Sequence, residues 1–233
     1  MSQPFQFKKF TIQQKINSQK VGTDSMLLGA WTKGAFNSIL DIGTGTGILA
    51  LMLAQQNPTA SIIAIEPDEA SLNEAKENFE NSPFANQIDA VQRSLQNFVT
   101  TKKFDLIIAN PPYFEESTLS KNENKNRARH TAALSIEELY FFSNQLLAPG
   151  GKLNLVFPFD LEAQHFQTAA KNNLFPHQIL RTIREDGERV RTLISYSQQK
   201  IKPLEEELIV KYGNNTYSAA YIELTKDFYF KTL

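Results

Sequence analysis

Residues 38–54 read Ser38-Ile39-Leu40-Asp41-Ile42-Gly43-Thr44-Gly45-Thr46-Gly47-Ile48-Leu49-Ala50-Leu51-Met52-Leu53-Ala54. The short apolar run at 38–42 predicts a buried strand, and residues 47–55 predict a helix. The glycines between them permit positive φ and let the main chain come close to a ligand. A strand, a glycine turn and a helix in this order are typical of an open α/β sheet.

The same alternation continues along the chain. Further strands are predicted at residues 61–66, 88–93, 104–109 and 152–157. Helices are predicted at residues 69–79, 135–147 and 161–172. Ser135 and Glu138 have the spacing of a capping box for the second of these helices. Strands that are apolar throughout and alternate with helices predict a parallel sheet with helices on both faces.

The pattern changes near both ends of the chain. After residue 173, strands without long helices between them are predicted at residues 179–183, 191–197, 207–212 and 217–224. We therefore expect antiparallel edge strands in this part. Pro149, Gly150 and Gly151 predict a turn, and residues 5–15 predict a small hairpin.

Composition excludes several classes of protein. The 233 residues carry a formal net charge of −1 and include no cysteine, which excludes disulfides, thiolate metal sites and cysteine nucleophiles. His130, His165 and His177 lack helical ligand spacing, so we expect no metal site and interpret each as a surface or capping residue. No apolar stretch is long enough to span a bilayer and residues 1–9 lack a signal core, so we expect a cytoplasmic protein without a membrane partner.

The glycine turn predicts a cofactor site. A helix that begins at the turn offers free N–H groups to a negatively charged ligand. Glu66 ends the next predicted strand, where its carboxylate can accept hydrogen bonds from two ribose hydroxyls. Ligands of open α/β sheets lie at the carboxyl ends of the strands, so these features together predict a cofactor that contains a nucleoside.

Asp41 favours one nucleoside cofactor over another. The glycine spacing still allows a shifted dinucleotide match that counts from Gly45 to Ala50, so a nicotinamide cofactor remains open. An acidic residue two positions before Gly43 would repel a pyrophosphate. It suits a ligand with an ammonium group, such as the methionine part of S-adenosylmethionine.

Asn110-Pro111-Pro112-Tyr113 follows the predicted strand at 104–109 directly. The two prolines hold the turn stiff. The Asn110 side-chain oxygen and the Pro111 carbonyl can accept hydrogen bonds from one planar NH₂ group, while Tyr113 stacks on the ring that carries it. Adenine N6, cytosine N4 and a glutamine amide present such a group, and two acceptors on its hydrogens favour the pyramidal nitrogen of methyl transfer.

These motifs resemble those of class I S-adenosylmethionine-dependent amino methyltransferases. Residues 20–31, read with Phe10 and residues 40–55, are similar to the bacterial tRNA1(Val) adenine-N6 methyltransferase family. The resemblance covers nearly the whole chain, from about Phe5 onward, and residues 20–31 separate this family from other enzymes with the Asn-Pro-Pro-Tyr motif. It implies N6-methylation of an adenine in the anticodon loop of tRNA by a seven-stranded sheet with one reversed strand.

The resemblance also assigns residues to the site. Asn110, Pro111, Pro112 and Tyr113 would hold the target base, the turn from Asp41 to Gly47 the methionine portion, and Glu66 the ribose. Ser94 stands where an acidic residue often binds the cofactor's adenine amino group, and Leu95 would pack on the adenine ring. The expected cofactor set is Thr23, Asp41, Gly43, Thr44, Gly45, Gly47, Glu66, Pro67, Ser94, Leu95 and Asn110. Residues 1–37 would form the N-terminal hairpin and a segment that covers the cofactor, and residues 38–233 the methyltransferase domain.

Three basic groups are candidates for RNA contact. The first lies in the segment after the target-base turn and comprises Lys121, Lys125, Arg127 and Arg129. The second is Lys8, Lys9, Lys15 and Lys20, and the third is Arg181, Arg184, Arg189 and Arg191. Either of the last two sets is equally compatible with ordinary surface charge.

Other functions stay open on sequence alone. The same chemistry would serve an adenine in rRNA or DNA, or a protein glutamine, although the 37 residues before the first strand are few for the extra domain that glutamine methyltransferases carry. A nicotinamide oxidoreductase gives Asn110 to Tyr113 no role. A non-catalytic RNA-binding or scaffold module on the same fold is also possible.

Overall fold

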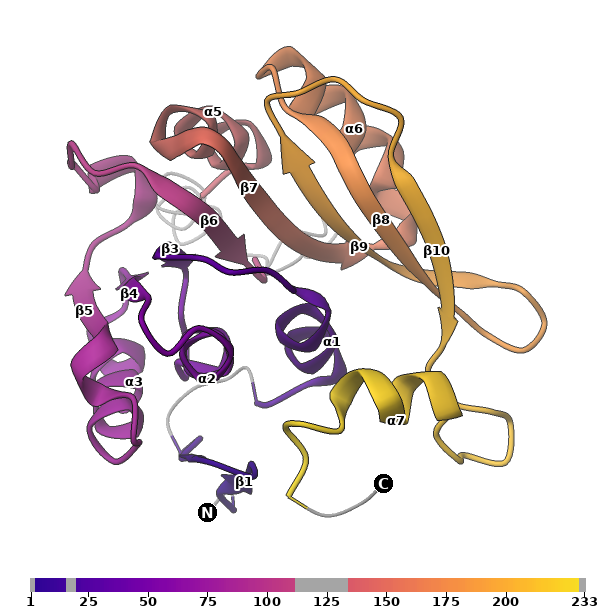
Figure 1. Cartoon of the computed structure of the whole chain (residues 1–233), viewed down its shortest axis with the longest axis horizontal. Helices are drawn as coiled ribbons and strands as arrows, with labels where there is room; N and C mark the ends of the chain where they lie inside the picture. The colour runs from indigo at the N-terminus through magenta and orange to yellow at the C-terminus, as the bar shows by residue number, and fades with distance from the viewer. Residues whose placement is uncertain (1–2, 16–19, 112–133, 231–233) are drawn as a thin grey trace, which may run out of the picture.

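The computed structural model describes residues 3–15, 20–111 and 134–230, and its centre is an eight-stranded sheet (Figure 1). The strands follow one another across the sheet in the order β10-β8-β9-β7-β6-β3-β4-β5. Their bounds are β3 (Ser38–Ile42), β4 (Ser61–Glu66), β5 (Ile88–Gln92), β6 (Phe104–Ala109), β7 (Leu147–Pro158), β8 (Phe175–Ile183), β9 (Arg189–Ser197) and β10 (Leu204–Ile209).

The predicted mostly parallel α/β sheet is confirmed, but the seven strands implied by the resemblance become eight. Only β9 runs against its neighbours in this sheet of the described residues, and it lies between β7 and β8 rather than at the edge. The eighth strand, β10, pairs parallel with β8, from Leu204 opposite Gln178 to Ile209 opposite Ile183. Strand β10 contains three consecutive glutamates and therefore lacks the apolar run that predicts a strand. An edge strand can carry such charged residues because it needs little apolar surface.

Helices cover both faces of the sheet (Figure 1). Their placement follows the alternation of side chains along the strands: Ile39 and Leu106 belong to one core cluster, Leu40 and Ile107 to the other. The first cluster takes in α1 (Thr23–Trp31), α2 (Ile48–Gln56), α3 (Glu69–Glu80) and α7 (Ala219–Thr225). The second takes in α5 (Ile136–Leu146) and α6 (Glu162–Lys171). Short 3₁₀ turns are η1 (Ala85–Gln87), η2 (Leu95–Asn97) and η3 (Phe159–Leu161).

The predicted N-terminal hairpin forms from β1 (Phe5–Gln6) and β2 (Thr11–Ile12), which pair antiparallel. Phe7 and Phe10 stack with ring centroids 4.3 Å apart, and both join the core cluster of α1 and α2. Residues 3–15 therefore share a core with the sheet domain.

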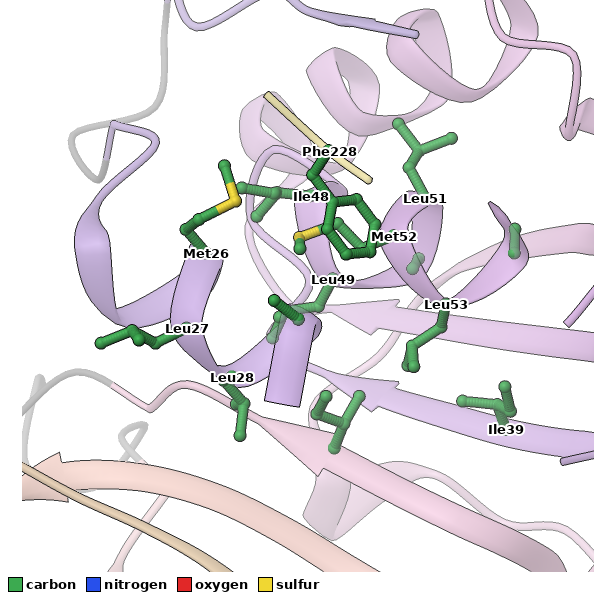
Figure 2. Packing of buried hydrophobic residues seen from close by; sticks show 14 of the residues in the cluster. Met26, Leu27, Leu28, Ile39, Ile48, Leu49, Leu51, Met52, Leu53 and Phe228 are labelled. Carbon is green, nitrogen blue, oxygen red and sulfur yellow. The ribbon is translucent and has the colours of Figure 1, made fainter. Parts of the chain in front are cut away.

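Helix α1 was not predicted. Residues from Ser25 to Ala30 are all buried, so the middle of this helix lacks the polar face and the apolar stripe of an amphipathic helix. Figure 2 shows Met26 of α1 close to Ile48 of α2. A helix segment that is buried on every side shows no alternation of apolar and polar residues, so its sequence does not predict an amphipathic helix.

The strand predicted at 217–224 is wrong, because α7 begins at Ala219 and takes up most of these residues. The Ser218 side chain accepts a hydrogen bond from the Tyr221 N–H at 3.0 Å, as an N-cap does, and donates to the Ile209 carbonyl. Tyr221 and Thr225 are buried four residues apart, on one helical face. The apparent alternation was the start of a short helix.

Two local predictions also need correction. His165 is a core residue, only 2% exposed, with its ring stacked on Phe157 and its Nδ1 2.7 Å from the Tyr140 hydroxyl. Burial lowers the pKa of His165 to about 4. The turn expected at residues 149–151 is an irregularity inside β7, where the pairing with β6 shifts register between Phe104 and Leu106.

In the part of the chain that the structure describes, no helix has the length and apolar character needed to cross a membrane.

Removal of the Ser218 cap should destabilise α7. We expect Ser218→Ala to lower the free energy of unfolding by about 1 kcal/mol, because the Tyr221 N–H and the Ile209 carbonyl both lose a partner. Urea denaturation measures this, with Ser218→Thr as a control that retains the hydroxyl. An unchanged unfolding midpoint for Ser218→Ala would contradict the assignment of the cap.

Candidate active site

Strands β3 and β6 are neighbours, and this pairing assembles the site. Ile42 lies opposite Ala109 in the parallel ladder, so the chain leaves the sheet at Gly43 and at Asn110 on the same edge. Strand β4 flanks β3 on its other side, with Ile65 opposite Ile42, which brings Glu66 to that edge too. The two motifs predicted to hold the cofactor and the target base are thereby brought together.

The glycine turn has a fixed backbone. Gly43, Gly45 and Gly47 all have positive φ, of 66°, 57° and 83°. The N–H groups of Gly43 and Thr44 both donate to the Ile65 carbonyl, at 2.9 and 3.1 Å. The turn is thus hydrogen-bonded to β4 before α2 begins.

Asp41 lies beneath this turn and does not line the cavity. Its side chain is fully buried, and its Oδ2 accepts a hydrogen bond of 2.6 Å from the Thr44 hydroxyl. Burial raises the pKa of Asp41 to about 7; the hydrogen bond from the Thr44 hydroxyl opposes the rise, and the nearby Glu66 adds to it. Asp41 therefore supports the turn from below through its hydrogen bond with Thr44. Its carboxyl group titrates near pH 7.

Glu66 braces the turn from the side. Its Oε2 accepts the Gly45 N–H and its Oε1 accepts the Asp68 N–H, both at 3.1 Å. Partial burial raises the pKa of this carboxyl group above its usual value, and the two backbone hydrogen bonds oppose the rise. Each carboxylate oxygen has a second lone pair, so Glu66 can still accept ribose hydroxyls.

A cavity of about 420 Å³ opens between the turn, α1 and the end of β6. Six of the predicted site residues line it: Thr23, Gly43, Thr44, Gly45, Asn110 and Pro111. Asp41, Gly47, Glu66, Pro67, Ser94 and Leu95 are not among the lining residues. Pro112 and Tyr113 lie outside the described residues.

Ser94 and Leu95 follow β5, one strand beyond Glu66. The Ser94 hydroxyl accepts a hydrogen bond of 3.1 Å from Asn97, and Leu95 is buried in the second core cluster. The adenine contacts expected of these residues stay a prediction.

Sequence reasoning missed several lining residues. Ser25 on α1 and Ile48 and Leu49 at the start of α2 face the cavity, as does Thr46 within the predicted turn. Asn78 on α3 was also missed: its Nδ2 donates to the Thr46 carbonyl at 2.8 Å and to the Gln13 carbonyl at 3.0 Å. An asparagine inside an amphipathic helix carries no signal of such a bridge between the N-terminal segment and the glycine turn.

The arginine group proposed for RNA contact is engaged in ion pairs. Each guanidinium contacts a carboxylate: Arg181 binds Glu162 and Glu205, Arg184 binds Glu188, Arg189 binds Glu207 and Arg191 binds Asp24. Acidic partners neutralise much of the charge of this surface. Arg191 and Lys20 nevertheless line the cavity. Lys121, Lys125, Arg127 and Arg129 lie outside the described residues.

Within the described ranges, no cluster of three His, Asp or Glu side chains is arranged to hold a metal ion.

Comparison with known proteins decides the family. The family model for the methyltransferase small domain matches residues 18–175. A protein of Bacteroides fragilis named tRNA1(Val) (adenine(37)-N6)-methyltransferase is 42% identical over 237 residues, covering 99% of this chain and 100% of its own. The protein of that name from Christiangramia forsetii is 38% identical and covers 99% of both chains.

The chain belongs to the tRNA1(Val) (adenine(37)-N6)-methyltransferase family. Solved structures agree on the fold. A predicted O-methyltransferase from Agrobacterium tumefaciens superposes with a TM-score of 0.69 at 17% identity, over 88% of this chain and 96% of its own. The 16S rRNA N2 G1207 methyltransferase of T. thermophilus, solved with AdoMet and guanosine, gives a TM-score of 0.56 at 20% identity, over 82% of this chain and 47% of its own.

The cavity suits the cofactor of a methyltransferase family. A Cβ added at Gly43 would meet no protein atom within 4 Å and would project from a residue that lines the cavity. A Cβ at Gly47 would instead lie 2.3 Å from the Phe79 ring. The absence of a side chain at Gly43 thus leaves the cavity open at this point, whereas Gly47 lets α2 approach α3.

These two glycines predict different defects on substitution by alanine. Gly47→Ala should lower the free energy of unfolding by about 2–5 kcal/mol, because positive φ and a clash with Phe79 act together. Gly43→Ala should lower it by only about 1–2 kcal/mol yet abolish measurable binding of S-adenosylhomocysteine. Urea denaturation and calorimetric titration separate the two effects. Normal cofactor binding by Gly43→Ala would contradict the role given to this turn.

The buried carboxyl group of Asp41 predicts a pH dependence. The folded protein holds the Asp41 proton up to about pH 7, whereas the same carboxyl group has its ordinary pKa of 3.8 in the unfolded chain. The contribution of Asp41 to stability therefore falls as the pH rises between these values. From pH 5 to pH 8 this loss amounts to roughly 3 kcal/mol. Asp41→Asn removes it, so the stability difference between variant and wild type should shift in favour of the variant by that amount. An identical difference at both pH values in urea denaturation would contradict the assignment.

Proposed function

We propose that this protein transfers a methyl group from S-adenosylmethionine to N6 of adenine 37 in tRNA1(Val). The observation that carries the proposal is the register of β3 against β6, which puts Asn110 beside the glycine turn at one cavity. Identity of about 40% to enzymes of this name, over nearly the full chain, supports the choice of substrate.

The cofactor would lie along the carboxyl edge of the sheet. Gly43, Thr44 and Gly45 would hold its methionine part, and the Glu66 carboxylate would accept its ribose hydroxyls. When bound, S-adenosylmethionine supplies an electrophilic methyl group on a positively charged sulfur. Asp41 acts indirectly, since its buried carboxyl group holds Thr44 in place.

Asn110 and Pro111 would position the target base. The Asn110 side-chain oxygen and the Pro111 carbonyl would each accept one hydrogen of the adenine amino group. Both hydrogens then lie to one side, which favours a pyramidal N6 with its lone pair directed at the methyl group. No strong base is needed, because the methylated nitrogen loses its extra proton readily to water, and catalysis consists of positioning and electrostatics.

The tRNA would reach the site through an unpaired base. An adenine in a loop leaves its stack at lower cost than a paired one, which suits the anticodon loop. We propose that Lys121, Lys125, Arg127 and Arg129 contact the phosphates and that Tyr113 stacks on the target adenine. We also propose a cytoplasmic location, which a tRNA substrate supports.

Substitution of Asn110 tests the proposed chemistry. We expect Asn110→Ala to lower kcat by about 10²–10³-fold, because the amino group loses an acceptor, while S-adenosylhomocysteine still binds. The assay uses an unmodified tRNA1(Val) transcript, a labelled methyl donor and mass spectrometry of the digested RNA.

The wild-type protein should yield N6-methyladenosine at position 37 only. The matched control is the same transcript with guanine at position 37, which should accept no methyl group. Methylation of another base or atom, or full activity of Asn110→Ala, would refute the proposal.

A further inference from the structure

We infer that Ser25 is a positioning residue, which orients the Asn110 side-chain amide so that its oxygen faces the target amino group. The inference rests on the proposed function and adds to it a residue on α1, remote from the Asn-Pro-Pro-Tyr motif in sequence. It assigns a role to the otherwise apolar helix that sequence patterning missed.

A direct hydrogen bond carries the inference. The Asn110 Nδ2 donates to the Ser25 Oγ at 2.9 Å, across 85 positions of the chain. Ser25 is 9% exposed, and both residues line the same cavity. The contact is therefore part of the wall against which the target base would lie.

The chemistry of the amide explains why this contact matters. A planar amide carries its oxygen and its nitrogen on opposite branches, and only the oxygen accepts hydrogen bonds. If the amide of Asn110 turned over, its NH₂ group would meet the NH₂ group of adenine, donor against donor. With Nδ2 donating to the Ser25 Oγ, the oxygen lies on the opposite branch of the amide, and its two lone pairs permit it to accept from the substrate as well as from the protein.

Ser25 can orient Asn110 because its helix is anchored to several elements. Its neighbour Asp24 accepts a hydrogen bond of 2.9 Å from the Arg191 Nε of β9. At the far end, the Asn154 side chain of β7 donates to the Thr32 hydroxyl at 3.0 Å. Met26 is 1% exposed and lies near α2, as Figure 2 shows. The first turn of α1 is thus fixed relative to the sheet that carries Asn110.

The experiment compares three serine variants with wild type on tRNA1(Val). Ser25→Ala removes the acceptor with little change of shape, Ser25→Thr keeps a hydroxyl, and Ser143→Ala is the matched control. Ser143 is fully buried on α5 and its hydroxyl has no hydrogen-bond partner among the described residues. For each variant, kcat, the KM for tRNA and the dissociation constant of S-adenosylhomocysteine are measured.

We expect Ser25→Ala to lower kcat about 10- to 100-fold, with the KM and the cofactor analogue's dissociation constant within about threefold of wild type. Ser25→Thr should keep at least about a third of the wild-type kcat, and Ser143→Ala should match wild type. Each of three results would overturn the inference: a kcat for Ser25→Ala within twofold of wild type, a Ser25→Thr as impaired as Ser25→Ala, or a loss of cofactor affinity equal to the loss of kcat. Failure of the wild-type protein to methylate N6 would refute the proposed function too, whereas wild-type activity matched by Ser25→Ala would refute the role of Ser25 alone.

Discussion

The parallel pairing of β3 with β6 is the constraint on which the rest of the structure depends. Main-chain hydrogen bonds place Ile42 opposite Ala109, and a shift of one residue would turn every side chain of the strand to the other face. The buried residues on both faces prevent such a shift, since Ile39 and Leu106 pack below one set of helices and Leu40 and Ile107 below the other. The core thus sets the distance between the glycine turn and Asn110.

Around this edge, polar side chains hold the backbone in place. Asp41 binds Thr44, Glu66 binds the Gly45 N–H, and Asn78 binds the Thr46 carbonyl. Two of these groups, Asp41 and Glu66, are carboxyl groups whose pKa is raised by burial, so their ionisation in the folded protein costs stability. Such a cost is common where a protein is shaped for a ligand rather than for folding alone. On the target-base side, Ser25 holds the side-chain amide of Asn110 in the same way, through a hydrogen bond.

The sequence was informative where local pattern and final environment agree. Strands such as β3 and β6 are buried on both faces and read as apolar runs, and the capping box of Ser135 and Glu138 is local, so these predictions were confirmed. The buried residues of α1 show no apolar periodicity, so the sequence pattern did not predict the helix or point to Ser25. The exposed edge strand β10 lacked an apolar run, and the buried His165 gained its partners, Tyr140 and Phe157, only through tertiary packing. Asn110 could be identified because its tetrapeptide is rare, but its contact with α1 could not.

The most direct test of the proposed mechanism is a crystal structure of the protein with S-adenosylhomocysteine and adenosine. We expect the methionine part of the cofactor product to lie against Gly43 to Gly45, and its ribose hydroxyls to bind Glu66. We expect the adenosine N6 to lie within hydrogen-bond distance of the Asn110 side-chain oxygen and the Pro111 carbonyl, on the side that faces the sulfur. An adenosine bound with its amino group turned away from Asn110, or a cofactor product bound away from the glycine turn, would contradict it.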